Sequence, residues 1–280
     1  MKKTFYIYIF LLMLLPLSVQ AETEEIVQVE ENDIIIVNAE RTSRWSSIKD
    51  YTSGILKSAA VGIEYRVKAG LAIGGTSPIP VPLEIQEITG FNPLLNAHLE
   101  GEVLKMFDDA WGLSFGLRLE SKGMKTDARV KNYNMKMVAE DGELAGRWTG
   151  MVETKVNNVY LTLPVLAVWR PAPRWGVKLG AYGSYLLSGH FSGAAYDGYL
   201  RVGDPTGEKV NVTSAIYNFS DDLRSWAWGV QLGGEWRAFP HLIVSADLTW
   251  GMNSIFGKDF EVITFNMYPI YGSLSFGYAF

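Results

Sequence analysis

The sequence predicts an all-β protein: a closed, antiparallel up-and-down barrel whose strands cross a membrane. Three observations predict this fold. Apolar and polar side chains alternate in several segments, the gaps between these segments are alternately long and short, and the last segment, Tyr268–Phe280, ends on an aromatic residue. Strict alternation is typical of a strand between two different environments, and repeated alternating segments of about ten residues are typical of outer-membrane barrels.

Each alternating segment is long enough to cross a bilayer, which takes about 9 to 11 tilted residues. The segments lie at residues 60–73, 94–106, 111–122, 157–169, 175–188, 224–238, 242–254 and 268–280. The gaps after the first, third, fifth and seventh segments are long and the others are short, which indicates long extracellular loops and short periplasmic turns. Eight strands are therefore predicted.

Two long gaps leave ten strands as the alternative. Residues 131–154 contain Asp141-Gly142, and residues 199–218 contain the sequence from Asp204 to Gly207. Both are good turn sequences between strand-like flanks, so the wall can continue there as hairpins above the membrane. Pro164 lies inside a predicted strand, where we expect a bulge or a position that tolerates the missing N–H.

Aromatic side chains are expected at the membrane interface and in the last strand. The interface aromatics are Trp111, Trp169, Trp175 and Trp236, all beside short gaps and in register with the apolar faces of their strands. Such a girdle is typical of membrane interfaces, where it contacts lipid, whereas the alternative is a set of core tryptophans in a soluble all-β protein. Tyr278 and Phe280 are the predicted assembly signal, read by the barrel-insertion machinery.

The opposite faces of the strands carry a lumen polar network. Its predicted members are Glu64, Arg66, Lys68, His98, Glu100, Glu102, Arg118, Glu120, Lys178, Gln231, Glu235, Arg237 and Asp247. Charges in a narrow interior are costly unless they are paired, and the six acids and five bases of this set are nearly balanced. A barrel of eight strands is only wide enough for its own side chains, so we expect a filled lumen.

The first 57 residues are expected to lie outside the barrel. Lysines and a short apolar run, followed by small residues up to Ala21, predict a signal peptide over residues 1–21; a membrane anchor is the alternative, but the run is too short. Residues 22–57 are expected to be a periplasmic N-terminal segment, either a linker or an element that docks a partner. Residues 58–280 are the predicted barrel domain, and the location is the outer membrane of a Gram-negative bacterium.

The sequence predicts no enzyme activity, no metal site and no cofactor. Residues 112–116 match a nucleophile-elbow pattern around Ser114, but the strand continues where the elbow needs a sharp turn into a helix. His98, His190 and His241 are expected far apart, so a membrane-bound hydrolase is a distant alternative. The chain has no cysteine, and its net charge of −5 argues against a nucleic-acid partner.

The chain resembles the PorT-like family of outer-membrane β-barrel proteins over about residues 59–280. The resemblance rests on residues 67–71 (VKAGL), 158–166 (NVYLTLPVL) and 180–187 (GAYGSYLL), together with the aromatic C-terminus. Thr162 stands where that family usually has an acidic residue. Some members are similar to accessory factors of a protein-secretion apparatus, which implies an envelope or secretion-system partner.

The function predicted from these patterns is that of a non-enzymatic outer-membrane barrel with a structural, adhesive or secretion-accessory role. The alternative is a narrow channel for a small or apolar solute. A filled lumen favours the first class, whereas measurable flux that responds to neutralising Glu100 or Arg118 would favour the second.

Overall fold

The computed structural model describes residues 62–139, 142–257, 260, 262–263 and 265–280. The predicted signal peptide, the N-terminal segment and the first residues of the predicted barrel domain lie outside the described residues. In the part that is described, no helix is long and apolar enough to cross a membrane.

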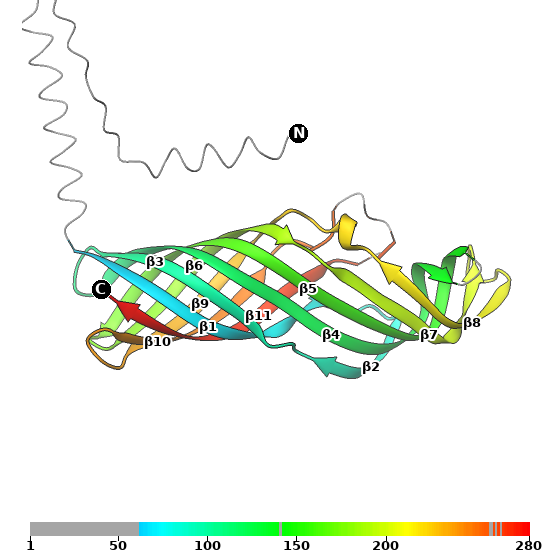
Figure 1. Ribbon diagram of the computed structural model, residues 1–280, viewed down its shortest axis with the longest axis horizontal. Helices are drawn as coiled ribbons and strands as arrows, with labels where there is room; N and C mark the ends of the chain where they lie inside the picture. The colour runs from blue at the N-terminus through cyan, green and yellow to red at the C-terminus, as the bar shows by residue number, and fades with distance from the viewer. Residues whose placement is uncertain (1–61, 140–141, 258–259, 261, 264) are drawn as a thin grey trace, which may run out of the picture. The chain divides into compact units, whose positions relative to one another are not determined.

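Eleven strands form one antiparallel sheet (Figure 1). They are β1 (Ile63–Pro78), β2 (Ile85–Asn92), β3 (Asn96–Met106), β4 (Trp111–Ala139), β5 (Gly142–Ala172), β6 (Trp175–Ser188), β7 (Phe191–Val202), β8 (Lys209–Asn218), β9 (Trp226–Arg237), β10 (Leu242–Gly251) and β11 (Met267–Ala279). A 3₁₀ turn, Ser220–Asp222, follows β8. The described strands therefore number eleven, more than the eight or ten that the sequence predicts.

The sheet is ring-like. The pairings run from β1 through β3, β4, β5, β6, β9, β10 and β11, and β11 pairs again with β1, so that Ala279 lies opposite Arg66. Each of these eight strands overlaps one of the eight segments that the alternation predicts, while β2, β7 and β8 are additional. The N–H group of Phe280 donates to the carbonyl of Tyr65 at 2.9 Å.

Alternation in the sequence becomes alternation in burial around the ring. In β3 and β9 almost every second side chain is buried and the residues between them are exposed. The buried positions of these two strands are polar or small, except Leu104, while the exposed positions are apolar or small, for example Leu99 and Leu232. The ring thus has a mostly polar interior and an apolar exterior, the inverse of a soluble sandwich.

The short turns are stabilised by hydrogen bonds between side chains and the backbone of the same turn. At the β3–β4 turn, Asp108 Oδ1 accepts hydrogen bonds from the N–H groups of Ala110 (2.8 Å) and Trp111 (2.6 Å). Pro240 lies in the β9–β10 turn, where its carbonyl accepts from Arg237.

Pro164 does not form the bulge that was one of its two expected outcomes. The register of β4 and β5 is the same on both sides of it, from Phe115 opposite Val165 to Arg118 opposite Thr162. The ladder lacks only the two pairs between them, because proline has no N–H to donate. The missing N–H is tolerated without a change of register.

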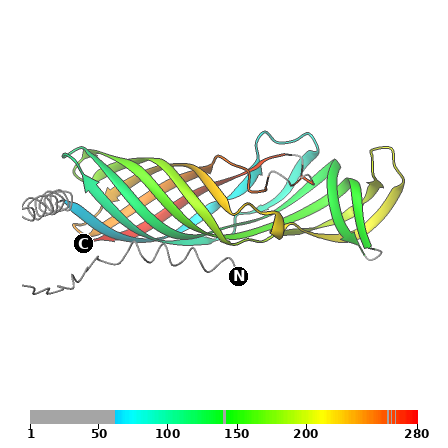
Figure 2. The same cartoon turned by 90° about the horizontal axis from the view of Figure 1, so that it is seen from above.

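Strands β4 and β5 continue far beyond the ring. At 29 and 31 residues they are about three times longer than a bilayer crossing requires. Beyond the ring, β5 pairs with β7 and β4 pairs with β2, while β7 and β8 form a hairpin. We call the group of β2, β7, β8, residues 123–139 of β4 and residues 142–156 of β5 the extension; Figures 1 and 2 show β7 and β8 at the end of the sheet away from the C-terminus.

The extension contains both hairpins expected from the turn sequences. The Asp204–Gly207 turn joins β7 to β8, and the Asp204 carboxylate accepts hydrogen bonds from the N–H and hydroxyl of Thr206, both at 2.7 Å. Asp141 lies outside the described residues. A bridge between Val138 and Ile216 joins β8 to β4. The strands β4, β5, β7 and β8 therefore curl around a common interior.

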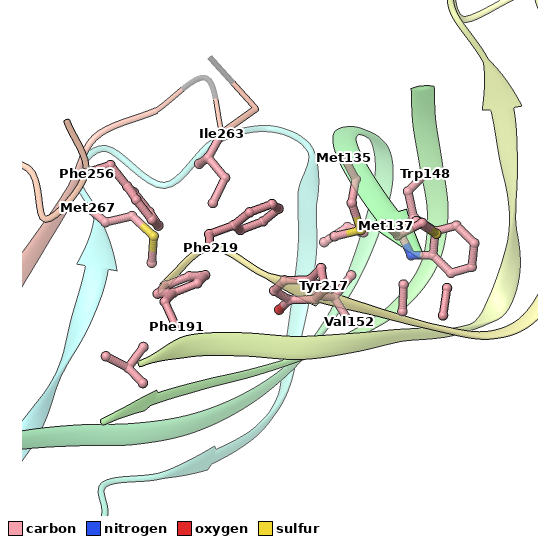
Figure 3. Close-up of a cluster of buried hydrophobic side chains, with 14 of the residues drawn as sticks. Met135, Met137, Trp148, Val152, Phe191, Tyr217, Phe219, Phe256, Ile263 and Met267 are labelled. Atoms are coloured by element: carbon pink, nitrogen blue, oxygen red, sulfur yellow. The ribbon is translucent and has the colours of Figure 1, made fainter. Parts of the chain in front are cut away.

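That interior is the main apolar core of the described chain (Figure 3). Trp148 and Leu200 are completely buried in it, and Phe191 packs edge to face against Phe256 at 4.9 Å between ring centroids. The core therefore lies in the extension and in the segment before β11, while the ring encloses polar side chains.

Candidate functional site

Ionised side chains inside the ring form one continuous chain of contacts. Acids and bases alternate along it in the order Arg237, Glu64, Arg66, Glu235, Lys178, Glu102, Lys68, Glu100, Arg118, Glu120 and Lys122. Successive nitrogen–oxygen distances are 2.5 to 3.0 Å, except 3.8 Å between Arg118 and Glu120. Every inner member has a partner of opposite charge on both sides.

The middle of this chain is closed to solvent. Lys68, Arg118 and Lys178 are each 2% exposed, and the glutamates between them are similarly buried. A buried charge is tolerated only when other charges and hydrogen bonds replace its hydration. The pairing therefore explains how so many charges can fill a narrow interior.

The remaining predicted network residues pair beside this chain. His98 Nε2 lies 3.1 Å from the Ser275 hydroxyl, and Gln231 Nε2 donates to Asp247 Oδ1 at 2.9 Å. Each of the predicted network residues therefore has a polar partner in the described structure.

Sequence reasoning missed Lys122, which ends the chain. Its ammonium lies 2.9 Å from Glu120 and over the rings of Tyr160, Tyr182 and Tyr271, at 5.5, 5.1 and 5.8 Å from their centroids. Aromatic faces attract a cation when it is removed from water. Lys122 follows Arg118 and Glu120 on the same face of β4, so its position in the alternation was the signal that could have revealed it.

Thr162 belongs to the same end of the network. Its hydroxyl donates to Glu120 Oε1 at 2.6 Å and lies 2.8 Å from the Ser184 hydroxyl. A carboxylate at this position would meet the carboxylate of Glu120, whereas the hydroxyl supplies a donor. The threonine that departs from the PorT-like pattern therefore has a partner in this chain.

Among the described residues, the candidate catalytic groups are not brought together. Ser114 is buried on the inner face of β4, with no hydrogen bond to a histidine in the described structure, and His241 lies in a turn where Nδ1 is 2.8 Å from the carbonyl of Ala279. Among the described residues, no group of three or more His, Asp or Glu side chains lies close enough to hold a metal ion.

The four predicted interface tryptophans are all exposed on the outside of the ring. Trp111 stacks on Trp169, and Trp175 stacks on Trp236; both pairs have ring centroids 6.2 Å apart. Tyr278 and Phe280 are also exposed, with their rings 5.0 Å apart. All six side chains lie on the outer face beside the short turns.

A cavity of about 340 Å³ lies where the ring meets the extension. Its lining comes from the end of β1, from β2, β4, β5, β7 and β8, and from the segment before β11. None of the described lining residues is charged, and most are aliphatic, aromatic or methionine. Cavities of this size and composition are typical of small-molecule sites.

Two tyrosines of the cavity lining are neutral. Burial raises the pKa of the Tyr133 phenol and of the Tyr217 phenol above their ordinary values. The Tyr217 hydroxyl also donates to the carbonyl of Glu153 at 2.7 Å and lies 2.7 Å from the hydroxyl of Thr154. The described lining is therefore uncharged, and the Tyr217 hydroxyl already has hydrogen-bond partners.

Comparison with known proteins places the chain in a family. The model of the outer membrane protein beta-barrel domain matches residues 55–257. No curated protein sequence matches the chain.

Among solved structures, the chain is similar to Ail, the attachment invasion locus protein of Yersinia pestis, whose structure contains the heparin analogue sucrose octasulfate. The identity is 11%, over 79% of this chain and 100% of that one, with a TM-score of 0.36. It is also similar to Neisserial surface protein A, at 13% identity over 78% and 96% of the two chains and a TM-score of 0.31. Sequence identities and TM-scores this low do not indicate a shared function. The family match is different, because it covers well over half of the 280 residues: the chain belongs to the outer membrane protein beta-barrel domain family.

Proposed function

We propose that the protein is a non-enzymatic outer-membrane barrel with a lumen filled by its own side chains, and that it acts through the extension. Family membership implies the outer membrane of a Gram-negative bacterium. The observation that carries the proposal is the alternating chain of ion pairs from Arg237 to Lys122, which leaves no inner charge without a partner. The role is structural, adhesive or secretion-accessory, as the PorT-like resemblance also suggests.

In this proposal β1, β3, β4, β5, β6, β9, β10 and β11 cross the membrane as eight strands, with the four tryptophans at the periplasmic interface. The apolar exterior of the ring supports the crossing, because lipid requires an apolar outer face. The extension then lies outside the cell, and Phe280 lies at the periplasmic rim, where the insertion machinery would read the last strand.

Conductance tests the filled lumen. The full chain, inserted in a planar bilayer, should show no steady current, because paired side chains occupy the path. A variant with Lys68, Glu100 and Arg118 all replaced by serine serves as the positive control for insertion, since it removes three neighbouring side chains from the lumen and leaves Glu102 with Lys178 and Glu120 with Lys122. Steady large conductance by the unaltered protein would contradict the proposal.

The absence of cysteine makes the orientation testable. Single substitutions Thr206→Cys, in the β7–β8 turn, and Asp109→Cys, in the β3–β4 turn, should leave both turns folded because both sites are exposed. A membrane-impermeant maleimide applied to intact cells should label only the Thr206→Cys variant, and should label both variants after the outer membrane is permeabilised. Labelling of the Asp109→Cys variant in intact cells would refute the orientation.

The second candidate function is a narrow channel for a small or apolar solute. The apolar cavity favours it, since an apolar solute could enter there. The ion-pair chain in the ring opposes it, because an apolar solute would have to displace paired charges. Flux that changes when Glu100 or Arg118 is neutralised would support this candidate over the first.

A further inference from the structure

We propose that the cavity between the ring and the extension binds a single hydrocarbon chain, such as a fatty acyl chain. This inference goes beyond the function proposed above, and it holds whether or not the lumen conducts. It assigns a ligand class to a part of the chain that the charged network does not reach.

The lining supports an uncharged, flexible ligand. Met124, Met135 and Met267 contribute thioethers, which adapt to ligands of varied shape, and the walls are completed by Val130, Val152 and Ile270. Since none of the described residues that line the cavity is charged, an ionised group beside them would lose its hydration without a partner. The bound part of the ligand must therefore be hydrocarbon, and any headgroup must stay outside.

Small residues create the space. Ala128 lies opposite Val152 in the β4–β5 ladder, and both line the cavity from neighbouring strands. Gly75 also lines the cavity, at a position where a Cβ atom would be 3.0 Å from the Met124 sulfur. Larger residues at these positions would fill the volume.

The cavity reaches the surface through an apolar patch. Val81, Ile88 and Phe91 line the cavity, yet they are 57%, 59% and 55% exposed, so each side chain contacts both the cavity and the outside. Ile79 and Leu83 beside them are also exposed. Contiguous exposed apolar residues mark sites that contact lipid or another apolar partner.

The position of this patch favours lipid as the source of the ligand. The patch follows the end of β1 directly, and the outer face of β1 is apolar up to Ile73. An acyl chain in the outer leaflet can therefore move along an apolar surface from the ring exterior to the cavity. The chain could belong to a membrane lipid or to a free fatty acid, because both present the same hydrocarbon.

Photocrosslinking tests the site and its source. The full chain, folded in phospholipid vesicles, is exposed separately to palmitic acid and to a phosphatidylcholine that each carry a diazirine in the acyl chain. Crosslinked peptides are then mapped. We expect labelling of residues 124–135 or 152–154 in addition to the lipid-facing band of the ring, and the probe that labels the cavity identifies the source.

Cavity-filling variants provide the decisive comparison. Ala128→Phe and Val152→Phe should each lose the cavity labelling while labelling of the ring exterior persists. Ala194→Phe is the matched control, since Ala194 lies on the outer face of β7, next to the buried Ala195, and should leave labelling unchanged. Heat-modifiable migration in gels shows which variants are folded. Absence of cavity labelling by both probes in the unaltered protein, or equal labelling in a folded cavity-filling variant, would overturn the proposal.

Discussion

Replacing Arg118 by methionine tests the ion-pair chain most directly. Arg118 is 2% exposed, its Nε lies 2.5 Å from Glu100, and its Nη1 lies 3.8 Å from Glu120. Methionine keeps much of the length of the side chain but removes the charge, so two buried carboxylates each lose a partner. Breaking a buried pair in this way costs about 3 to 5 kcal/mol of the free energy of unfolding.

The structure indicates the lower end of that range. After the substitution, Glu100 keeps Lys68 at 2.8 Å, and Glu120 keeps Lys122 at 2.9 Å. Neither carboxylate is left alone, so we expect a loss of about 3 kcal/mol. Urea unfolding of the protein in lipid vesicles, followed by tryptophan fluorescence, measures this free energy.

Two further variants make the result interpretable. Arg129→Met changes an exposed arginine of the same strand in the extension, and should cost less than about 1 kcal/mol. The double variant Arg118→Met with Glu100→Gln removes the carboxylate that the single variant leaves underpaired, and should recover about half of the loss. If Arg118→Met costs no more than Arg129→Met, the lumen is hydrated and the account of a filled, paired interior is wrong.

The remaining predictions concern the extension core, the interface and the last strand. Trp148→Ala removes a completely buried side chain and should cost the extension about 3 to 5 kcal/mol, seen as faster proteolysis within β7 and β8 while the ring stays heat-modifiable. Trp175→Ala loses the stacking on Trp236, worth about 0.5 to 1.5 kcal/mol, and should lower the urea midpoint slightly without affecting proteolysis of the extension. Deleting Phe280 removes the hydrogen bond to Tyr65 and should reduce insertion in cells, measured as the heat-modifiable fraction, more than a Phe239→Ala substitution at an exposed turn.

The strands of the ring could be predicted from the sequence because the alternation that defines each of them is visible within a single segment. Each strand has an apolar face and a polar face, and alternation shows this within a single segment. Charge balance among the polar faces then predicts a paired interior. Which acid pairs with which base could not be predicted, because the pairing depends on how neighbouring strands are staggered in the ring. For example, Glu102 pairs with both Lys68 and Lys178.

The extension was only partly predicted because bulges interrupt its alternation. The β4–β5 register shifts between Val130 and Tyr133, where Asn132 has a φ of 59°. The shift moves the buried positions from even numbers, ending at Val130, to odd numbers, including Met135 and Met137. A prediction based on strict alternation therefore ends the strand at this point, although β4 continues to Ala139.

The membrane boundary that we propose coincides with an inversion of the pattern along the sequence. On β4, the inner face changes from charged residues ending at Lys122 to apolar residues beginning at Met124, while the outer face changes from Leu119 to charged residues beginning at Lys125. On β5, the inner face changes from polar Asn158 to apolar Val156, which lies opposite Met124, and the outer face changes from Val159 to charged Lys155.

Two neighbouring strands thus exchange their inner and outer patterns at the same level. A single strand could do so by chance, but a shared level requires a common cause. In the membrane placement that we propose, this cause is the change of solvent from lipid to water outside the ring, with the matching change from a paired polar interior to an apolar one. The cross-strand pair of Lys125 with Glu153, at 3.0 Å on the outer face, lies beyond this level. The apolar cavity begins there as well, at Met124, so the hydrocarbon-binding site that we propose lies where the lipid-facing surface and the apolar core come closest together.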